Sequence, residues 1–357
     1  MSALPVSAVD AISPALKHAR AQLFPFRWGQ WARLALLGLA TGEMSSSGGC
    51  NAPSNFRIPV RPEGSSRHLA GSSLPHFDPH ALGAIIFWIA LLALAAAVLV
   101  LLMIFVSSVC RFILFESVLE RHCALRRGWH RWQPQGRSYF GFQLLLLLAM
   151  IAGLALLAGG AAAVGFGTGW LRHPSEHVLP LVLGGILLVL LFAAFMISMA
   201  VIAVLTKDFV VPQMALEDVG VAEGWRRLRI MMRREEVRYA GYVGMKILLA
   251  LAAAVIFGIA IVLVFLVLLI PGIIVGIVVA LAVKSMGLVW SAATIALAVT
   301  LGLVAVLLLV FLAAFISAPV TVFFPAYSMH FFAGRYSPLA ARLHPEPPVP
   351  PPEPAPA

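Results

Sequence analysis

The sequence contains few charged residues. Asp, Glu, Lys and Arg make up only 11% of its 357 residues, and 61% are hydrophobic, whereas a soluble domain has about 25% charged residues. This scarcity excludes a soluble globular enzyme and an intrinsically disordered chain. It indicates a membrane protein, because about 20 apolar residues cross a bilayer as a helix and this chain can supply several such helices.

Cysteine is scarce as well, and catalytic motifs are missing. The three cysteines, Cys50, Cys110 and Cys123, are too few and too scattered for a disulfide framework. Cys123 follows His122, but two adjacent residues without further ligands make a poor metal site. The sequence has no CxxC, HExxH or GxSxG motif. We therefore expect no metal, no cofactor and no enzymatic activity.

Acidic residues are absent from the long apolar runs. Proton-coupled and ion-coupled transporters usually keep an acid within the membrane, so this absence argues against those classes. The basic residues Lys246 and Lys284 lie near enough to the ends of runs to reach the headgroups. We expect the carboxylates of the basic segments to pair with arginines rather than to perform acid–base catalysis. These carboxylates are Glu116, Glu120, Glu217, Asp218 and Glu223.

Five long apolar runs are present, and each is long enough to cross a bilayer. They cover about 81–106, 140–164, 179–205, 239–270 and 287–316. We expect Pro271 and Gly272 to end the helix after the fourth run, so that 272–283 forms a re-entrant or half helix. Residues 30–42, the end of a helix predicted over 9–42, form either an interfacial helix or a short first crossing.

Positive charge is distributed unevenly along the chain. The net charge is +10, and 13 of the 25 Lys and Arg residues fall in 107–138 and 206–238, which join apolar runs. The positive-inside rule makes both segments, and with them the C-terminus, cytoplasmic in the inner membrane of a bacterium. Membrane lipids with anionic headgroups are the expected partners at that face. We expect no nucleic acid, and an unknown membrane protein partner remains open.

These patterns predict an all-α, polytopic transmembrane helix bundle with about six crossings plus one half helix. Residues 1–42 form an N-terminal amphipathic or interfacial helix with the short first crossing, and 43–80 a flexible loop rich in Gly, Ser and Pro. Residues 81–343 form a repeated transmembrane helical domain. The Pro-rich tail, 344–357, is expected to be disordered.

The two basic segments resemble each other. Phe112, Gly128 and Tyr139 of the first match residues of the same type 97, 96 and 100 positions later, and a third partial copy begins at Val322. We infer an old duplication in which each unit places an interfacial helix between two crossings.

The interfacial helices carry the candidate lipid contacts. In 224–238, Trp225, Leu228, Met231 and Met232 form an apolar side that we expect to face the membrane, and the arginines beside them are expected to reach headgroups. The candidate headgroup and interface residues of both copies are Arg126, Arg127, Trp129, Trp225, Arg226, Arg227, Arg229, Arg233 and Arg234.

Two stretches of sequence carry a family resemblance. They are LFPFRWGQWARLALLGLATG, followed by a Ser/Gly/Asn-rich loop, and DFVVPQMALEDVGVAEGWRRL with the Tyr-started helix after it, within residues 10–250. They resemble an uncharacterised family of bacterial polytopic membrane proteins. The Phe-x-x-Pro, Gly-Trp and Tyr-helix layout is distantly similar to the membrane domain of glycerophosphodiester phosphodiesterases. The catalytic barrel of those enzymes is absent here, so the resemblance implies a membrane module without that activity.

Three functional hypotheses follow from the sequence. The first is a non-catalytic membrane module that organises lipid or protein partners through its basic interfacial helices. The second is a transporter or flippase of a lipid-like or other amphiphilic molecule, which the half helix and the repeat favour because broken helices build substrate sites. The third is a membrane enzyme that acts at Glu116, Glu120 or Glu217, which would require these carboxylates to converge in one pocket.

Overall fold

The computed structural model of the chain describes residues 7–43, 79–170, 177–285 and 292–344. Within these ranges every regular element is a helix, which confirms the predicted all-α class. The predicted loop, apart from its ends, and the predicted tail, apart from His344, lie outside the described residues. Five helices are long: α4 (Pro79–Leu119), α5 (Leu125–Gly167), α6 (Val178–Leu205), α9 (Glu236–Ser285) and α10 (Ala292–Ile316).

Seven further elements are short and connect or pack against the long helices. They are α1 (Ile12–Leu23), α2 (Trp28–Thr41), the π-helix η1 (Thr206–Val210), α7 (Val211–Glu217), α8 (Val221–Arg234), α11 (Ala318–Ala333) and α12 (Ser337–Leu343). The basic segments 107–138 and 206–238, which were expected to contain interfacial helices, are mostly helical. The turn between α4 and α5 covers only 120–124.

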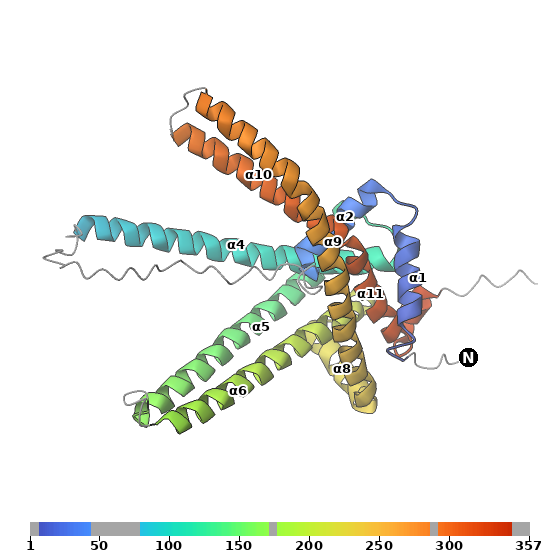
Figure 1. The fold of residues 1–357 in the computed structure, drawn as a ribbon. Coiled ribbons are helices and arrows are strands. Elements are labelled where there is room, and N and C mark those ends of the chain that lie inside the picture. The colour runs from blue at the N-terminus through green and yellow to red at the C-terminus, as the bar shows by residue number, and fades with distance from the viewer. Residues whose placement is uncertain (1–6, 44–78, 171–176, 286–291, 345–357) are drawn as a thin grey trace, which may run out of the picture.

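The long helices radiate from a common centre, which we call the hub (Figure 1). The hub consists of their inner ends and the seven short elements, and it contains nearly all the buried side chains. The outer parts, which we call the arms, are α4 alone, the α5–α6 hairpin and the α9–α10 hairpin. Each of the five long helices could cross a membrane by its length and composition, and the most apolar stretch of each contains no buried residue. This all-round exposure of apolar side chains is what helices surrounded by lipid require.

The first crossing predicted at 30–42 is not among these five helices. Helix α2 has 14 residues, which span about 21 Å at the rise of an α-helix, short of the roughly 30 Å of a bilayer core. Its residues Leu34, Ala35 and Leu37 are buried against neighbouring helices. Helix α2 therefore belongs to the hub, and its apolar face is occupied by protein.

The predicted break at Pro271 is also wrong, because α9 continues through it to Ser285. A proline removes one backbone hydrogen bond, but transmembrane helices tolerate this when local adjustments satisfy the freed carbonyl. The half helix at 272–283 is therefore the last part of a helix of 50 residues. The side chain of Lys284 lies outside the described ones.

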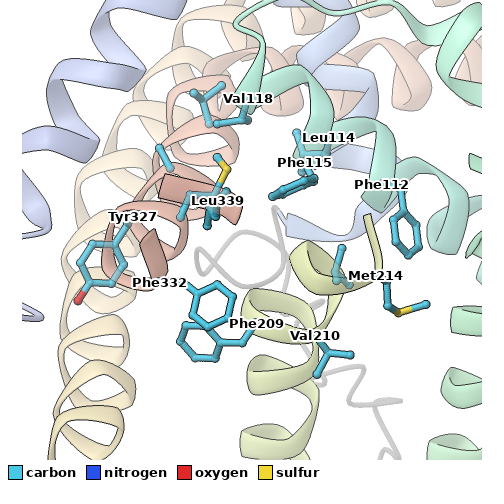
Figure 2. Close-up of a cluster of buried hydrophobic side chains, with 14 of the residues drawn as sticks. Phe112, Leu114, Phe115, Val118, Phe209, Val210, Met214, Tyr327, Phe332 and Leu339 are labelled. Atoms are coloured by element: carbon cyan, nitrogen blue, oxygen red, sulfur yellow. The ribbon is translucent and has the colours of Figure 1, made fainter. Parts of the chain in front are cut away.

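Aromatic side chains fill the centre of the hub. Phe112 of α4, Phe209 of η1 and Phe332 of α11 are fully buried, and with Met214 and Leu339 they belong to one cluster of buried side chains (Figure 2). Burial of their apolar surface stabilises the fold by roughly 25 cal/mol per Å² removed from water. The hub is therefore the folded core from which the arms extend.

Helix α1 is fixed to this core by polar contacts. His18 Nε2 lies 2.7 Å from the carbonyl oxygen of Val118, and Gln22 Nε2 donates to the carbonyl oxygen of Ser117 at 2.9 Å. Tyr327 Oη donates to the carbonyl oxygen of Ala8 at 3.0 Å. The N-terminal region is thus held against the ends of α4 and α11.

Candidate lipid-binding site

Helix α8 is the predicted basic interfacial helix. It begins after Gly220, carries Glu223 in its first turn and Arg233 and Arg234 in its last turn, an order that matches the helix dipole. Its buried residues are Val221, Gly224 and Leu228. The predicted helix at this place is confirmed.

The direction of its apolar side differs from the prediction. Leu228 is fully buried, and Trp225, Met231 and Met232 pack against the buried cluster of the hub. The apolar side therefore rests largely on protein instead of facing the membrane, because the hub offers a hydrophobic surface that the sequence pattern alone could not distinguish from lipid.

Gly224 allows this close packing. A Cβ atom at this position would lie 2.7 Å from Cγ1 of Val210, well inside van der Waals contact. Gly128, the matching glycine of α5, has the same relation to Ile113 of α4, at 3.1 Å. The two glycines thus let α8 and α5 approach equivalent residues of η1 and α4.

The arginines of α8 divide into two groups. Arg226, Arg229, Arg233 and Arg234 are exposed, whereas Arg227 is half-buried. Arg227 is paired with Glu217, and its Nε donates to Glu223 at 2.9 Å. It therefore serves to hold α7 and α8 together, and the exposed arginines remain at the surface.

A groove runs between α6, α8 and α9. It has a volume of about 580 Å³. Arg229, Arg233 and Glu236 supply its charged groups, and the other lining residues are Val201, Leu205, Trp225, Met232, Tyr239, Ala240 and Val243. The groove thus joins apolar parts of two membrane-spanning helices to two arginines, a combination suited to an acyl chain with an anionic headgroup.

The candidate residues of the first copy lie elsewhere. Arg126 and Arg127 are exposed in the first turn of α5, and Trp129 is half-buried with its ring edge-on to Phe105, 6.4 Å between centroids. None of these three candidates is among the residues that line the groove.

The expected pairing of carboxylates with arginines is confirmed for Glu116, Glu217 and Glu223, whereas Asp218 accepts a hydrogen bond from Gln135 Nε2 at 2.6 Å. Glu116 pairs with Arg131 at 2.6 Å and accepts a hydrogen bond from Trp132 Nε1 at 2.5 Å. Glu223 pairs with Arg226 at 2.8 Å. Among the described residues no group of three or more His, Cys, Asp or Glu could hold a metal ion.

The hub contains a group of buried charges that the sequence pattern did not predict, and we call this group the charge network. It consists of Glu43, Arg111, Lys207, Asp208 and Lys246. Glu43 pairs with Arg111 at 3.2 Å and with Lys207, and Arg111 Nη2 donates to the carbonyl oxygen of Thr41 at 2.9 Å. Burial alone would raise the pKa of Glu43, but the charges of Lys207, Arg111 and Lys246 lower it to about 2.

Asp208 and Lys246 form the second half of the network. They pair with each other, and Tyr242 Oη donates to Asp208 at 2.9 Å. Lys246, predicted to reach the headgroups, is instead only 8% exposed. The sequence contained one signal for the network: Arg111 and Asp208 are charged residues 97 positions apart, the spacing of the inferred repeat.

A second, larger cavity of about 1020 Å³ lies between α2, α4, α5 and α6. Its walls are apolar and include four methionines, with a few polar groups at one end. The methionines are Met103, Met150, Met196 and Met199, and the lining residues at the polar end include Thr41, Gly42, Ser107, Cys110 and Gln143.

Comparisons with known proteins place the chain in a family. A model described as "Family of unknown function (DUF7544)" matches residues 6–342. No curated protein and no solved structure matches the chain, and no link to glycerophosphodiester phosphodiesterases is shown. Because the match covers nearly the whole chain, the protein belongs to this family of unknown function, DUF7544.

Proposed function

We propose that this protein is a non-catalytic module of the bacterial inner membrane that binds anionic lipids at the cytoplasmic face and thereby organises lipid or partner proteins. The groove between α6, α8 and α9 carries this proposal, because it places Arg229 and Arg233 beside an apolar wall that continues into two membrane-spanning helices. Each basic residue near an anionic surface contributes about 1 kcal/mol of attraction.

The lengths of the helices support placing this groove at the membrane surface. Helix α5 has 43 residues and α9 has 50, which correspond to about 65 and 75 Å. Only about 20 residues of each are needed to cross the hydrocarbon core. In α5 the surplus includes the basic inner part 125–138, which precedes the apolar run at 140–164, and we expect this part to lie in the headgroup region and the water.

Parallel contacts in the two copies support the duplication. Phe112 lies edge-on to Tyr139, 6.0 Å between centroids, and Phe209 lies edge-on to Tyr239 at 5.3 Å. Arg121 and Asp218, which occupy matching positions, both have positive φ angles, 54° and 57°. The same local fold at two places would present basic helices side by side at one face of the membrane.

The proposal is tested by lipid retention. The full chain in mild detergent is incubated with 1-palmitoyl-2-oleoyl-phosphatidylglycerol, and bound lipid is counted by native mass spectrometry. Two lost charges at about 1 kcal/mol each correspond to roughly 30-fold. We expect the double variant Arg229→Gln, Arg233→Gln to bind the lipid of this groove about that much more weakly, which appears as the loss of one bound lipid per chain. The matched control is Arg126→Gln, Arg127→Gln, which removes two exposed arginines that do not line the groove.

Equal losses in the two double variants would contradict a specific groove and would indicate general surface charge. Retention of phosphatidylcholine as strong as that of phosphatidylglycerol in the wild-type chain would contradict selection for anionic lipid.

The second candidate function is a carrier for an amphiphilic molecule. The half helix that favoured it is absent, since α9 is continuous. The cavity between α2, α4, α5 and α6 now supports it, because apolar walls beside a few polar groups suit an amphiphilic cargo.

A further inference from the structure

The cavity between α2, α4, α5 and α6 ends beside the charge network. Thr41 and Gly42 line this end. The carbonyl oxygen of Thr41 accepts the hydrogen bond from Arg111, and Glu43 follows Gly42 directly in the chain. The apolar cavity and the buried charges are therefore neighbouring parts of one region.

Two cations of the network continue the walls of the cavity. Ser107 lines the cavity on α4, and Arg111 follows four residues later; Ala203 lines it at the end of α6, and Lys207 follows four residues later. Residues four apart lie on the same side of a helix. Arg111 and Lys207 thus lie about one helical turn from Ser107 and Ala203, in the direction of the hub.

The charge network has one cation more than it has acids. Arg111, Lys207 and Lys246 carry three positive charges, and Glu43 and Asp208 carry two negative charges, so the network has a net charge of +1. Buried charge that is not compensated is costly. Arg111 and Lys207 keep 11% and 17% of their side-chain surface accessible, so an anion can reach them.

We propose that the cavity binds an acyl chain of an anionic phospholipid whose phosphate lies against Arg111 and Lys207. The volume of about 1020 Å³ lies at the upper end of the range of ligand sites, about 300–1,000 Å³. The four methionines adapt to a flexible hydrocarbon chain. A single negative charge on the headgroup neutralises the network. A membrane phospholipid is the occupant because the cavity lies between helices whose outer parts are exposed to the bilayer.

This site is separate from the α8 groove, since the two share no lining residue. The test uses the full chain with phosphatidylglycerol that carries a photoreactive diazirine on one acyl chain. After irradiation, labelled peptides are identified by mass spectrometry. We expect labels in 103–110 of α4, 143–150 of α5 and 196–203 of α6. The Arg229→Gln, Arg233→Gln variant should keep this labelling, which separates the present site from the proposed function.

Two variants examine the site itself. Ala203→Phe fills the cavity and should remove most of the labelling, whereas Ala194→Phe, on the exposed part of the same helix, should leave it unchanged. Lys207→Gln should weaken the retention of phosphatidylglycerol by about fivefold, as the loss of one cation predicts. It should leave the retention of phosphatidylcholine with the same chains unchanged.

Several results would overturn the inference. These are labels confined to α8 and α9, equal labelling of the Ala203→Phe and Ala194→Phe variants, and equal weakening of phosphatidylglycerol and phosphatidylcholine retention in the Lys207→Gln variant. Preferential retention of free palmitate would overturn the assignment to a phospholipid. If Lys207→Gln fails to fold, the comparison of the two alanine variants still decides the outcome, because neither changes a charge.

Discussion

At the scale of single residues, the buried charges of the hub are what set this protein apart from a simple apolar bundle. Asp208 and Lys246 are 3% and 8% exposed and pair with each other. A buried ion pair gives little net stability, but removing one partner leaves an uncompensated charge. These residues should therefore tolerate single substitutions poorly.

We expect Asp208→Asn to destabilise the protein by about 3–5 kcal/mol, because it leaves Lys246 buried without a carboxylate. Chemical unfolding in detergent measures this change. The double variant Asp208→Asn, Lys246→Met should recover much of the loss, since it removes both charges. Glu223→Gln, in an exposed ion pair, serves as a control with little expected effect. Equal stability of Asp208→Asn and the control would contradict the assigned pair.

Glu43 should make the stability depend on pH in a defined window. Its pKa is lowered from 4.5 to about 2 in the folded protein. A lowered carboxyl pKa contributes stability that is fully present above about pH 4.5 and is lost as the pH falls toward 2. The shift corresponds to about 3 kcal/mol. We expect the difference in unfolding free energy between wild type and Glu43→Gln to shrink across this window and to be constant between pH 5 and 7. A difference that does not change with pH would contradict the burial of an ionised Glu43.

At the scale of elements, glycines allow close packing between helices of the hub, and two of them occupy matching positions. Gly224 brings α8 onto η1, and Gly128 brings the start of α5 onto the end of α4. A Cβ atom at Gly224 would require the side chain of Val210 to shift, and one at Gly128 would require Ile113 to give by a few tenths of an ångström. The position of the basic helix at the surface therefore depends on a residue without a side chain.

We expect Gly224→Ala to destabilise the protein by about 1–3 kcal/mol, the usual cost of an overpacked contact. The added Cβ would lie 2.7 Å from Val210 Cγ1. Gly241→Ala in α9 is the matched control: no atom lies within 4 Å of its Cβ, and alanine favours a helix over glycine by up to about 1 kcal/mol. Unfolding curves of both variants give the comparison, and adding Val210→Ala should restore Gly224→Ala. Failure of that rescue would show that the contact is not the cause.

At the scale of the whole molecule, the hub and the arms meet different surroundings. All charges of the network lie in the hub, and the arms expose apolar side chains on every side. Side chains in the hub are therefore packed against protein, whereas we expect lipid to cover the apolar side chains of the arms. The hub is expected at the cytoplasmic face, where the basic segments belong under the positive-inside rule.

We expect the two ends of α5 to be accessible from opposite sides of the membrane. In a chain with its cysteines replaced, Arg126→Cys marks the hub end and Thr168→Cys marks the outer end; both positions are exposed. A membrane-impermeant maleimide should label Thr168→Cys from outside intact cells and Arg126→Cys only in inverted vesicles. Labelling of both from the same side would contradict the crossing by α5.

The sequence by itself determined the helical class, the five long apolar helices, the basic helix α8 and the pairing of Glu116, Glu217 and Glu223 with arginines. These follow from local composition and periodicity, because long apolar runs and neighbouring charges act over a few residues. Tertiary structure decided the rest. Helix α2 is too short to cross the membrane and packs in the hub. Helix α9 is continuous through Pro271. The apolar side of α8 packs against protein. The charge network could not be predicted from local sequence, because Glu43, Arg111 and Asp208 are far apart along the chain. Only the packing of helices in the hub brings these charges together. Once buried there, each charge requires a partner of opposite sign.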